Sequence, residues 1–268
     1  MTSPEKMNQF NVRRENFNTY EKFLDTTLSL HKEGISLFTQ DFDKWDFYFD
    51  GFWLREVVDY AQKTVDLNIP TVDKAIQASV YEYAFDRGAF DPTTGIEHKT
   101  HTTYEKGLFF FGDDMLSQMR YLGSIRDDDN LEMLPIPSAD GNVSAIIRQF
   151  AAISSSSKNA ELAWRFIKIL LNDECQSGLY QQAGVRRSSI DKNIDNTSSL
   201  CYTVPYDELI IQLKEYYKSY DNAVLARVNA GTHTFSVLKP WNIDTDDPLD
   251  INEQKIKINN ELLIWLSE

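Results

Sequence analysis

Apolar residues recur every three or four positions in several parts of the chain, a spacing that predicts amphipathic helices. The first such helix follows Asn18 and Glu21, which resemble a capping box, and Gly34 marks its C-terminal end. The residues that we expect on its apolar face are Phe23, Leu24, Thr27, Leu28 and His31.

Further helices are predicted along the rest of the chain. An aromatic and acidic segment at 41–53 merges into a helix near 54–65, and Thr71 opens the next one. Two more helices are expected near 206–220 and 251–266. Helices therefore account for a large part of the predicted structure.

Short apolar runs bounded by turn residues predict strands between these helices. Such runs occupy 35–38, 108–111, 131–141 and 143–154. Strands that alternate with helices are typical of α/β architecture. No internal repeat or low-complexity linker interrupts this order.

The stretch "FAAISSSSKNAELAWRFIKILLNDECQ" at 150–176 combines a strand-like start, a serine run and a strongly amphipathic end. Asn159 is the expected N-cap of a helix, and Glu161 in the first turn is favourable to the helix dipole. The polar side of this helix carries Arg165, Lys168 and Asn172. The expected apolar stripe consists of Ala163, Phe166, Ile167 and Leu170.

Composition and charge exclude several classes of protein. The chain has 268 residues, of which 42% are hydrophobic, enough for one large domain or two lobes. Its 41 acidic and 27 basic residues give a net charge of −14, which repels nucleic acid and anionic membrane surfaces. No apolar run approaches the ~18 residues of a membrane-spanning helix. Residues 1–17 do not resemble a signal peptide, because no hydrophobic stretch follows their charges.

No motif predicts a cofactor or a metal site. Cys175 and Cys201 lack the spacing of redox or zinc sites, and they form no disulfide framework, although a single bridge between them stays open. The His98 and His101 pair has no Glu or Cys at metal spacing. The acidic segment 244–253 lacks the glycine of an EF-hand loop. We therefore expect no cofactor.

Several segments together resemble family 1 extracellular solute-binding proteins, the ligand receptors of bacterial ABC importers. "LPIPSADG" and the stretch 150–176 resemble the C-terminal half of that family. "TYEKFLDTTLSLHKEGISLF" resembles its threonine-led helix and following strand, and "TYEKGLFFFGDD" resembles a glycine-containing segment. "INEQKIKINNELLIWLSE" is similar to its closing helix. The resemblance covers most of the chain, in the family's order.

This resemblance implies an α/β fold of the type II periplasmic-binding-protein kind, a mixed sheet flanked by helices, of which the chain holds the C-terminal two-thirds. Residues 1–150 then form the main part of the second lobe, 151–187 return to the first lobe, and 188–268 complete the second lobe. Most of the first lobe is missing, so we expect a truncated chain. The apolar stripe at 163–170 would then lose some of the surface that normally covers it, and we expect this stripe to be hidden by a rearrangement or by self-association.

The resemblance also implies a function: non-catalytic capture of a sugar or oligosaccharide between two lobes and its delivery to ABC permease subunits. The full-length form would be an extracellular lipoprotein anchored to the membrane. The alternatives are a glycoside hydrolase, because acids and aromatics also line sugar-cleaving sites, and an interaction module that assembles through the uncovered lobe surface. No acid pair on strand ends is recognisable, which favours a binding protein over an enzyme.

Candidate ligand-binding residues follow from aromatic surfaces and planar polar groups, which suit the two faces of a sugar. Asp41, Asp43 and Trp45 match by position a loop of the family that touches ligand, whereas the later aromatics of 41–53 also suit a helix core. Asp113 and Asp114 follow a strand at its C-terminal end, where α/β clefts collect ligand groups, or cap a helix there.

Two arginines complete the candidate set. Arg148 lies at the end of the strand that crosses between the lobes, where it faces the cleft or forms an ion pair across the hinge. Arg186 lies in "GVRRSS", which stands where the family often has a different glycine-containing segment, and it is otherwise a solvated surface residue.

Overall fold

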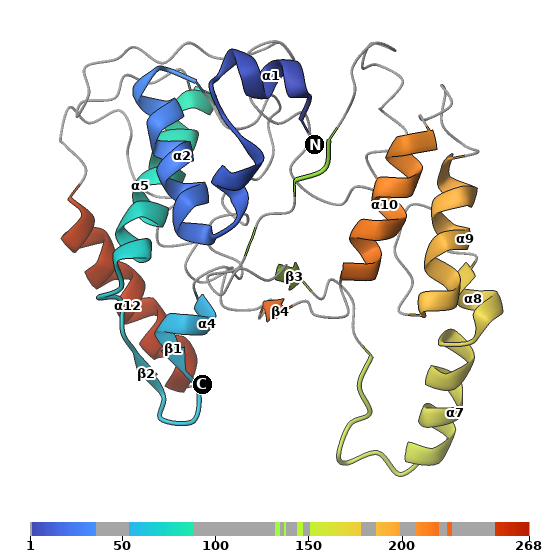
Figure 1. Ribbon diagram of the computed structural model, residues 1–268. Coiled ribbons are helices and arrows are strands. Elements are labelled where there is room, and N and C mark those ends of the chain that lie inside the picture. The colour runs from blue at the N-terminus through green and yellow to red at the C-terminus, as the bar shows by residue number, and fades with distance from the viewer. Residues whose placement is uncertain are drawn as a thin grey trace. The chain divides into compact units, whose positions relative to one another are not determined.

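A computed structural model describes the protein in two compact units (Figure 1). The first unit comprises Met1–Gly112, Leu134–Ile147 and Asn222–Glu268, and the second comprises Asp113–Met133 and Arg148–Asp221. The residues that the structure describes are 2–35, 54–87, 132–134, 137, 144–146, 151–177, 186–198, 207–219, 224–226 and 250–267.

The first unit begins with two short helical segments that lead into a long helix. Ser3 caps α1 (Pro4–Gln9), and its hydroxyl accepts a hydrogen bond from the backbone N–H of Lys6 at 3.2 Å. The 3-10 helix η1 (Arg14–Phe17) follows, and then α2 (Tyr20–Lys32). The N-cap of α2 is Thr19, not the predicted Asn18, because the Thr19 hydroxyl accepts the N–H of Lys22 at 3.3 Å.

The apolar face predicted for α2 is confirmed. Phe23 and Leu24 are completely buried, and Leu28 is partly buried against the same core. Gly34 follows the helix with a φ of 72°, the left-handed conformation that glycine adopts readily at a helix end. The rings of Tyr20 and Phe23 stack at 6.1 Å between centroids. Of the strand predicted at 35–38, residues 36–38 lie outside the described residues.

The helix predicted near 54–65 is wrong beyond its first turn. Helix α4 (Leu54–Val57) gives way to a hairpin of β1 (Val58–Asp59) and β2 (Thr64–Val65), paired antiparallel with Val58 opposite Val65. The Asp59 carboxylate accepts the backbone N–H groups of Ala61 and Gln62, both at 2.9 Å. An aspartate that bonds to the following backbone in this way stabilises a turn in competition with the helix.

Helices α5 (Pro70–Arg87) and α12 (Ile251–Ser267) complete the core of the first unit. Pro70 occupies the first position of α5, where its fixed φ and missing N–H suit a helix start. The helix predicted from Thr71 and the closing helix at 251–266 are thus confirmed. Ile76 of α5 is completely buried in the core that this unit shares, and both α2 and α12 pack against α5 (Figure 1).

Strands β3 (Ser144–Ile146) and β4 (Val224–Ala226) pair in parallel, with Ala145 opposite Leu225. Part of the strand predicted at 143–154 is therefore confirmed, whereas 151–153 are irregular. Parallel neighbours require a crossover connection, so this pair is typical of α/β architecture. Among the described residues the sheets have two strands each, and the mixed sheet expected from the family resemblance stays a prediction.

The second unit contains α7 (Ala160–Leu170), α8 (Asp173–Ser177), α9 (Arg187–Ser198) and α10 (Asp207–Ser219). The helices predicted after the serine run and near 206–220 are confirmed, but no pattern had indicated α9. Its contacts with α8 are polar: the side-chain amide of Asn193 donates to the carbonyl of Gln176 at 2.8 Å. Lys214 of α10 pairs with Asp195 of α9 at 2.7 Å.

Helix α7 has no buried residue along its length. Asn159 is its N-cap as predicted, but the Asn159 side chain makes no capping hydrogen bond. Of the predicted stripe, Ala163 and Ile167 are half-buried, whereas Phe166 and Leu170 are exposed. That a rearrangement or self-association hides this face stays a prediction.

Candidate functional site

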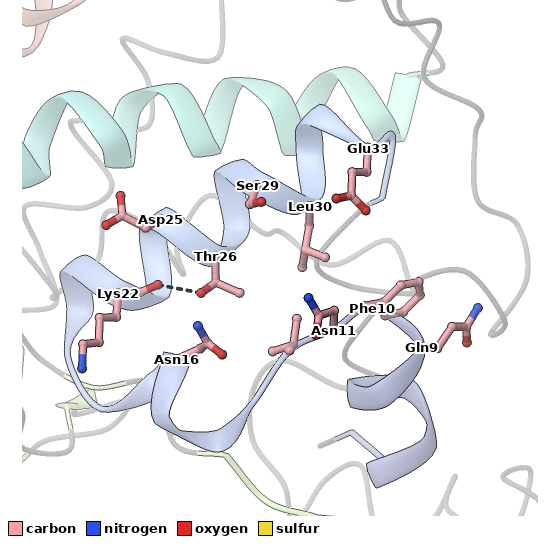
Figure 2. A pocket seen from close by; sticks show the side chains of 11 residues that line it. Gln9, Phe10, Asn11, Asn16, Lys22, Asp25, Thr26, Ser29, Leu30 and Glu33 are labelled. Atoms are coloured by element: carbon pink, nitrogen blue, oxygen red, sulfur yellow. Dashed lines mark hydrogen bonds between the residues drawn. The ribbon is translucent and has the colours of Figure 1, made fainter.

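A pocket of about 370 Å³ lies in the first unit between α2 and the segment that joins α1 to η1 (Figure 2). Figure 2 shows Asn11 and Asn16 on one side of it and Thr26 and Leu30 of α2 on the other. The residues that line the pocket are Gln9, Phe10, Asn11, Val12, Asn16, Lys22, Asp25, Thr26, Ser29, Leu30 and Glu33.

The first wall depends on a sharp reversal of the chain after α1. Asn11 has a φ of 53°, a left-handed conformation that asparagine tolerates better than most residues. The N–H of Val12 then donates to the carbonyl of Met7 at 2.8 Å, which closes the turn. The Asn16 side-chain oxygen accepts the N–H of Arg13 at 2.7 Å, so the amide of Asn16 is held at the pocket edge.

The second wall is a side of α2 on which Thr26 and Leu30 are buried while Asp25 and Ser29 are exposed. The Thr26 hydroxyl donates to the carbonyl of Lys22 at 2.8 Å, so this hydroxyl is already satisfied within the helix. Asp25 is paired with Lys74 of α5, whose ammonium lies 2.7 Å from the carboxylate. The hydrogen bonds that the Lys74 ammonium donates to Asp25 and then to Glu21 raise its pKa.

The chemistry of this pocket suits a neutral polar ligand. Amides, hydroxyls and carboxylates supply donors and acceptors, and Phe10 supplies one flat apolar surface. Asp25 and Glu33 are two helical turns apart, about 12 Å along the axis of α2. Paired acids of glycosidases lie about 5–9.5 Å apart, so these two carboxylates do not form such a pair along the helix.

The predicted site residues fall mostly outside the described part of the chain. Arg186 is described: it is exposed, and its guanidinium donates to the Asp173 carboxylate at 2.8 Å. Arg186 and then the Ser188 hydroxyl hold the pKa of Asp173 below its ordinary value. A ligand role for Arg186 stays a prediction. The candidates outside the described residues are Asp41, Asp43, Trp45, Asp113, Asp114 and Arg148.

Sequence reasoning did not anticipate the pocket, because its lining comes from three separate elements with no motif in common. The polar residues after α1, Asn11 and Asn16 among them, are the one signal in the sequence, and they fit an ordinary loop equally well. In the described part of the chain no group of three or more His, Cys, Asp or Glu side chains could hold a metal ion. Cys175 is an exposed free thiol, and Cys201 lies outside the described residues.

Searches for similar proteins leave the family unassigned. No model of a known protein family matches the chain, and no curated protein matches it either. The described helices include none that is long and apolar enough to span a membrane. The resemblance to solute-binding proteins therefore stays a prediction.

Proposed function

We propose that the protein is the solute-binding component of a bacterial ABC importer and that it binds a carbohydrate without chemical conversion. The stretch 150–176, together with the preceding "LPIPSADG", is the observation that carries this proposal. Its helix begins after Asn159, the N-cap that the residue pattern predicts. Closure of two lobes around the ligand would couple binding to delivery to the permease.

The proposed ligand contacts are the predicted residues of the cleft. Trp45 offers an aromatic face, while Asp43 and Asp113 offer planar oxygens for sugar hydroxyls. The pocket beside α2 is a second place where a sugar-sized, uncharged ligand fits, and its volume and polar lining support that use.

Titration calorimetry of the whole chain against a panel of monosaccharides and oligosaccharides tests the proposal. We expect saturable binding of at least one sugar, and Trp45→Ala should weaken it at least tenfold, about 1.4 kcal/mol. Trp164→Ala is the matched control, because this tryptophan is exposed on α7 and is not among the predicted contacts. A panel without any binding sugar would contradict the proposal.

Two further measurements separate the alternatives. Ser29→Trp fills the pocket beside α2 from an exposed position, so loss of binding in this variant alone would place the sugar there. Release of a chromophore from aryl glycosides would instead favour the glycoside hydrolase, because a receptor breaks no bond.

A further inference from the structure

The α2 wall of the pocket carries opposite charges at its two ends. Four lining residues follow one another at intervals of four, three and four, so they share one side of the helix: Lys22, Thr26, Ser29 and Glu33. The first and the last of them are three helical turns apart, about 16 Å along the axis. Figure 2 shows Lys22 and Glu33 at opposite ends of the pocket. The pocket therefore has a cation at one end and an anion at the other.

These two charges are available to a ligand. Within the described part of the chain, no ion pair involves Lys22 or Glu33, and both side chains are exposed. Asp25 also lines the pocket, but the Lys74 ammonium at 2.7 Å offsets its charge. A ligand with one anionic and one cationic group, neutral overall, thus matches the two charges that remain.

The Lys22 end of the pocket suits a carboxylate. Lys22 lies in the first turn of α2, where the helix dipole is positive. The side-chain oxygen of Asn16 accepts the N–H of Arg13, so the amide N–H groups of Asn16 are left as donors. Figure 2 shows the Asn16 nitrogen turned toward α2. An ammonium and an amide that line the same end of a pocket supply the hydrogen bonds that a carboxylate accepts.

The Glu33 end of the pocket suits an ammonium group. Glu33 is the C-cap of α2, where the helix dipole is negative. Phe10 lies at the same end on the other wall (Figure 2), and its ring is half-buried. A carboxylate and an aromatic face are the two kinds of group that attract an ammonium ion. The two ends together give the bound ligand a direction, because its anion lies toward Lys22 and its cation toward Glu33.

The stretch between the two ends suits the backbone of a short peptide. Val12 and Leu30 are buried and apolar, while Asn11 and Ser29 offer polar groups to peptide N–H and C=O groups. An extended chain spans about 3.3–3.6 Å per residue, so three or four residues cover about 10–14 Å. This length fits between the two charged side chains, whose backbones are about 16 Å apart. An uncharged sugar would leave both charges unmatched.

We propose that the pocket beside α2 binds a peptide of three or four residues with free amino and carboxyl termini. The peptide carboxylate lies toward Lys22 and Asn16, and its ammonium lies toward Glu33 and Phe10. The volume of about 370 Å³ falls within the usual range for small-ligand pockets. This peptide site goes beyond the proposed carbohydrate function and does not depend on it.

Titration calorimetry of the whole chain with tri-alanine and tetra-alanine tests the proposal. We expect saturable binding of at least one of these peptides, with a Kd below about 1 mM. N-acetylation and C-terminal amidation should each weaken this binding at least threefold, because each removes one terminal charge. A Kd above about 1 mM for both peptides, or equal binding of the free and blocked forms, would overturn the proposal.

Two substitutions assign the direction of the peptide. In Glu33→Gln the free and N-acetylated peptides should bind equally well, because the partner of the ammonium is gone, while amidation still weakens binding. Lys22→Gln should show the converse pattern. An exchange of these two patterns would overturn the proposed direction, and unchanged binding in both variants would overturn the site.

Two further variants tie the binding to this pocket. Ser29→Trp fills the pocket and should abolish peptide binding. Lys32→Gln is the matched control: Lys32 is exposed on α2 but does not line the pocket, so the Kd should stay within about twofold. Circular dichroism checks that each variant is folded. Peptide binding that survives Ser29→Trp would contradict the proposal, whereas the sugar panel with Trp45→Ala tests the carbohydrate function separately.

Discussion

Helices α2 and α7 carry equally clear apolar stripes, yet one stripe is buried and the other is largely exposed. The stripe of α2 is buried against α5 and η1, with Phe23 and Leu24 completely inaccessible. The stripe of α7 has no buried residue, and Phe166 is 60% exposed. Amphipathic spacing thus predicts that a helix forms and which side is apolar, while other parts of the structure decide whether that side is covered.

The largest expected effect separates these two stripes directly. Phe23→Ala should lower the free energy of unfolding by about 3–5 kcal/mol, because it opens a cavity in a packed core. Phe166→Ala should change it by less than about 0.5 kcal/mol in dilute solution, because the side chain loses few contacts. Urea unfolding followed by circular dichroism measures both.

A milder substitution keeps this comparison measurable if Phe23→Ala does not fold. Phe23→Leu retains most of the apolar volume and should still cost about 1 kcal/mol or more. Equal effects of substitutions at Phe23 and Phe166 would show that the two apolar stripes are equally buried.

A second prediction concerns Tyr20 of α2, whose side chain is completely buried in the core. Burial, and then the charge of Glu56, raise the pKa of Tyr20 well above its ordinary value. The unfolded chain loses this proton near pH 10 while the folded chain keeps it, so stability falls above pH 10, by up to about 1.4 kcal/mol per pH unit.

Lys74 adds to the same alkaline loss. Its raised pKa contributes stability that is fully present below about pH 10 and is lost as pH rises through the folded-state pKa. Tyr20→Phe removes only the tyrosine contribution, so the stability advantage of the natural chain over this variant should shrink between pH 9 and 11. A constant difference over that range, measured by urea unfolding, would contradict the assignment.

The N-caps of the two helices provide the third contrast. Thr19 accepts a capping hydrogen bond from Lys22, whereas Asn159 makes none with its side chain. Thr19→Ala should therefore cost about 1 kcal/mol, and Asn159→Ala only a few tenths. Thermal unfolding of both variants at pH 7 measures the difference, and a larger loss at Asn159 would refute this account of the two caps.

The sequence predicted both helices because their apolar period is local, and the bounds of α7 agree with the expected N-cap at Asn159. It failed at 54–65, where the Asp59 side chain stabilises a turn that apolar spacing does not reveal. The pocket beside α2 could not be predicted, since Asn11 and Ser29 line the same pocket only after the chain reverses between α1 and α2. Cover of the α7 face is likewise a property of tertiary packing.

The smallest expected effect concerns the ion pairs that fasten α2 to α5. The Lys74 ammonium lies 2.9 Å from Glu21 and 2.7 Å from Asp25, two carboxylates one turn apart on α2. Lys74→Met leaves these like charges facing each other without a cation, so it should cost about 0.5–1 kcal/mol at low salt.

The matched control is Lys257→Met on α12. Among the described residues, the ion-pair partner of this ammonium is Glu253, at 2.7 Å. Its loss should cost less, about 0.3–0.5 kcal/mol, because no repulsion between carboxylates is released. Since salt screens partly exposed charges, about 1 M NaCl should reduce both effects and bring them together. A gap between Lys74→Met and Lys257→Met that persists at this salt concentration would show that the Lys74 stem packs between α2 and α5, and that its contribution is apolar contact more than charge.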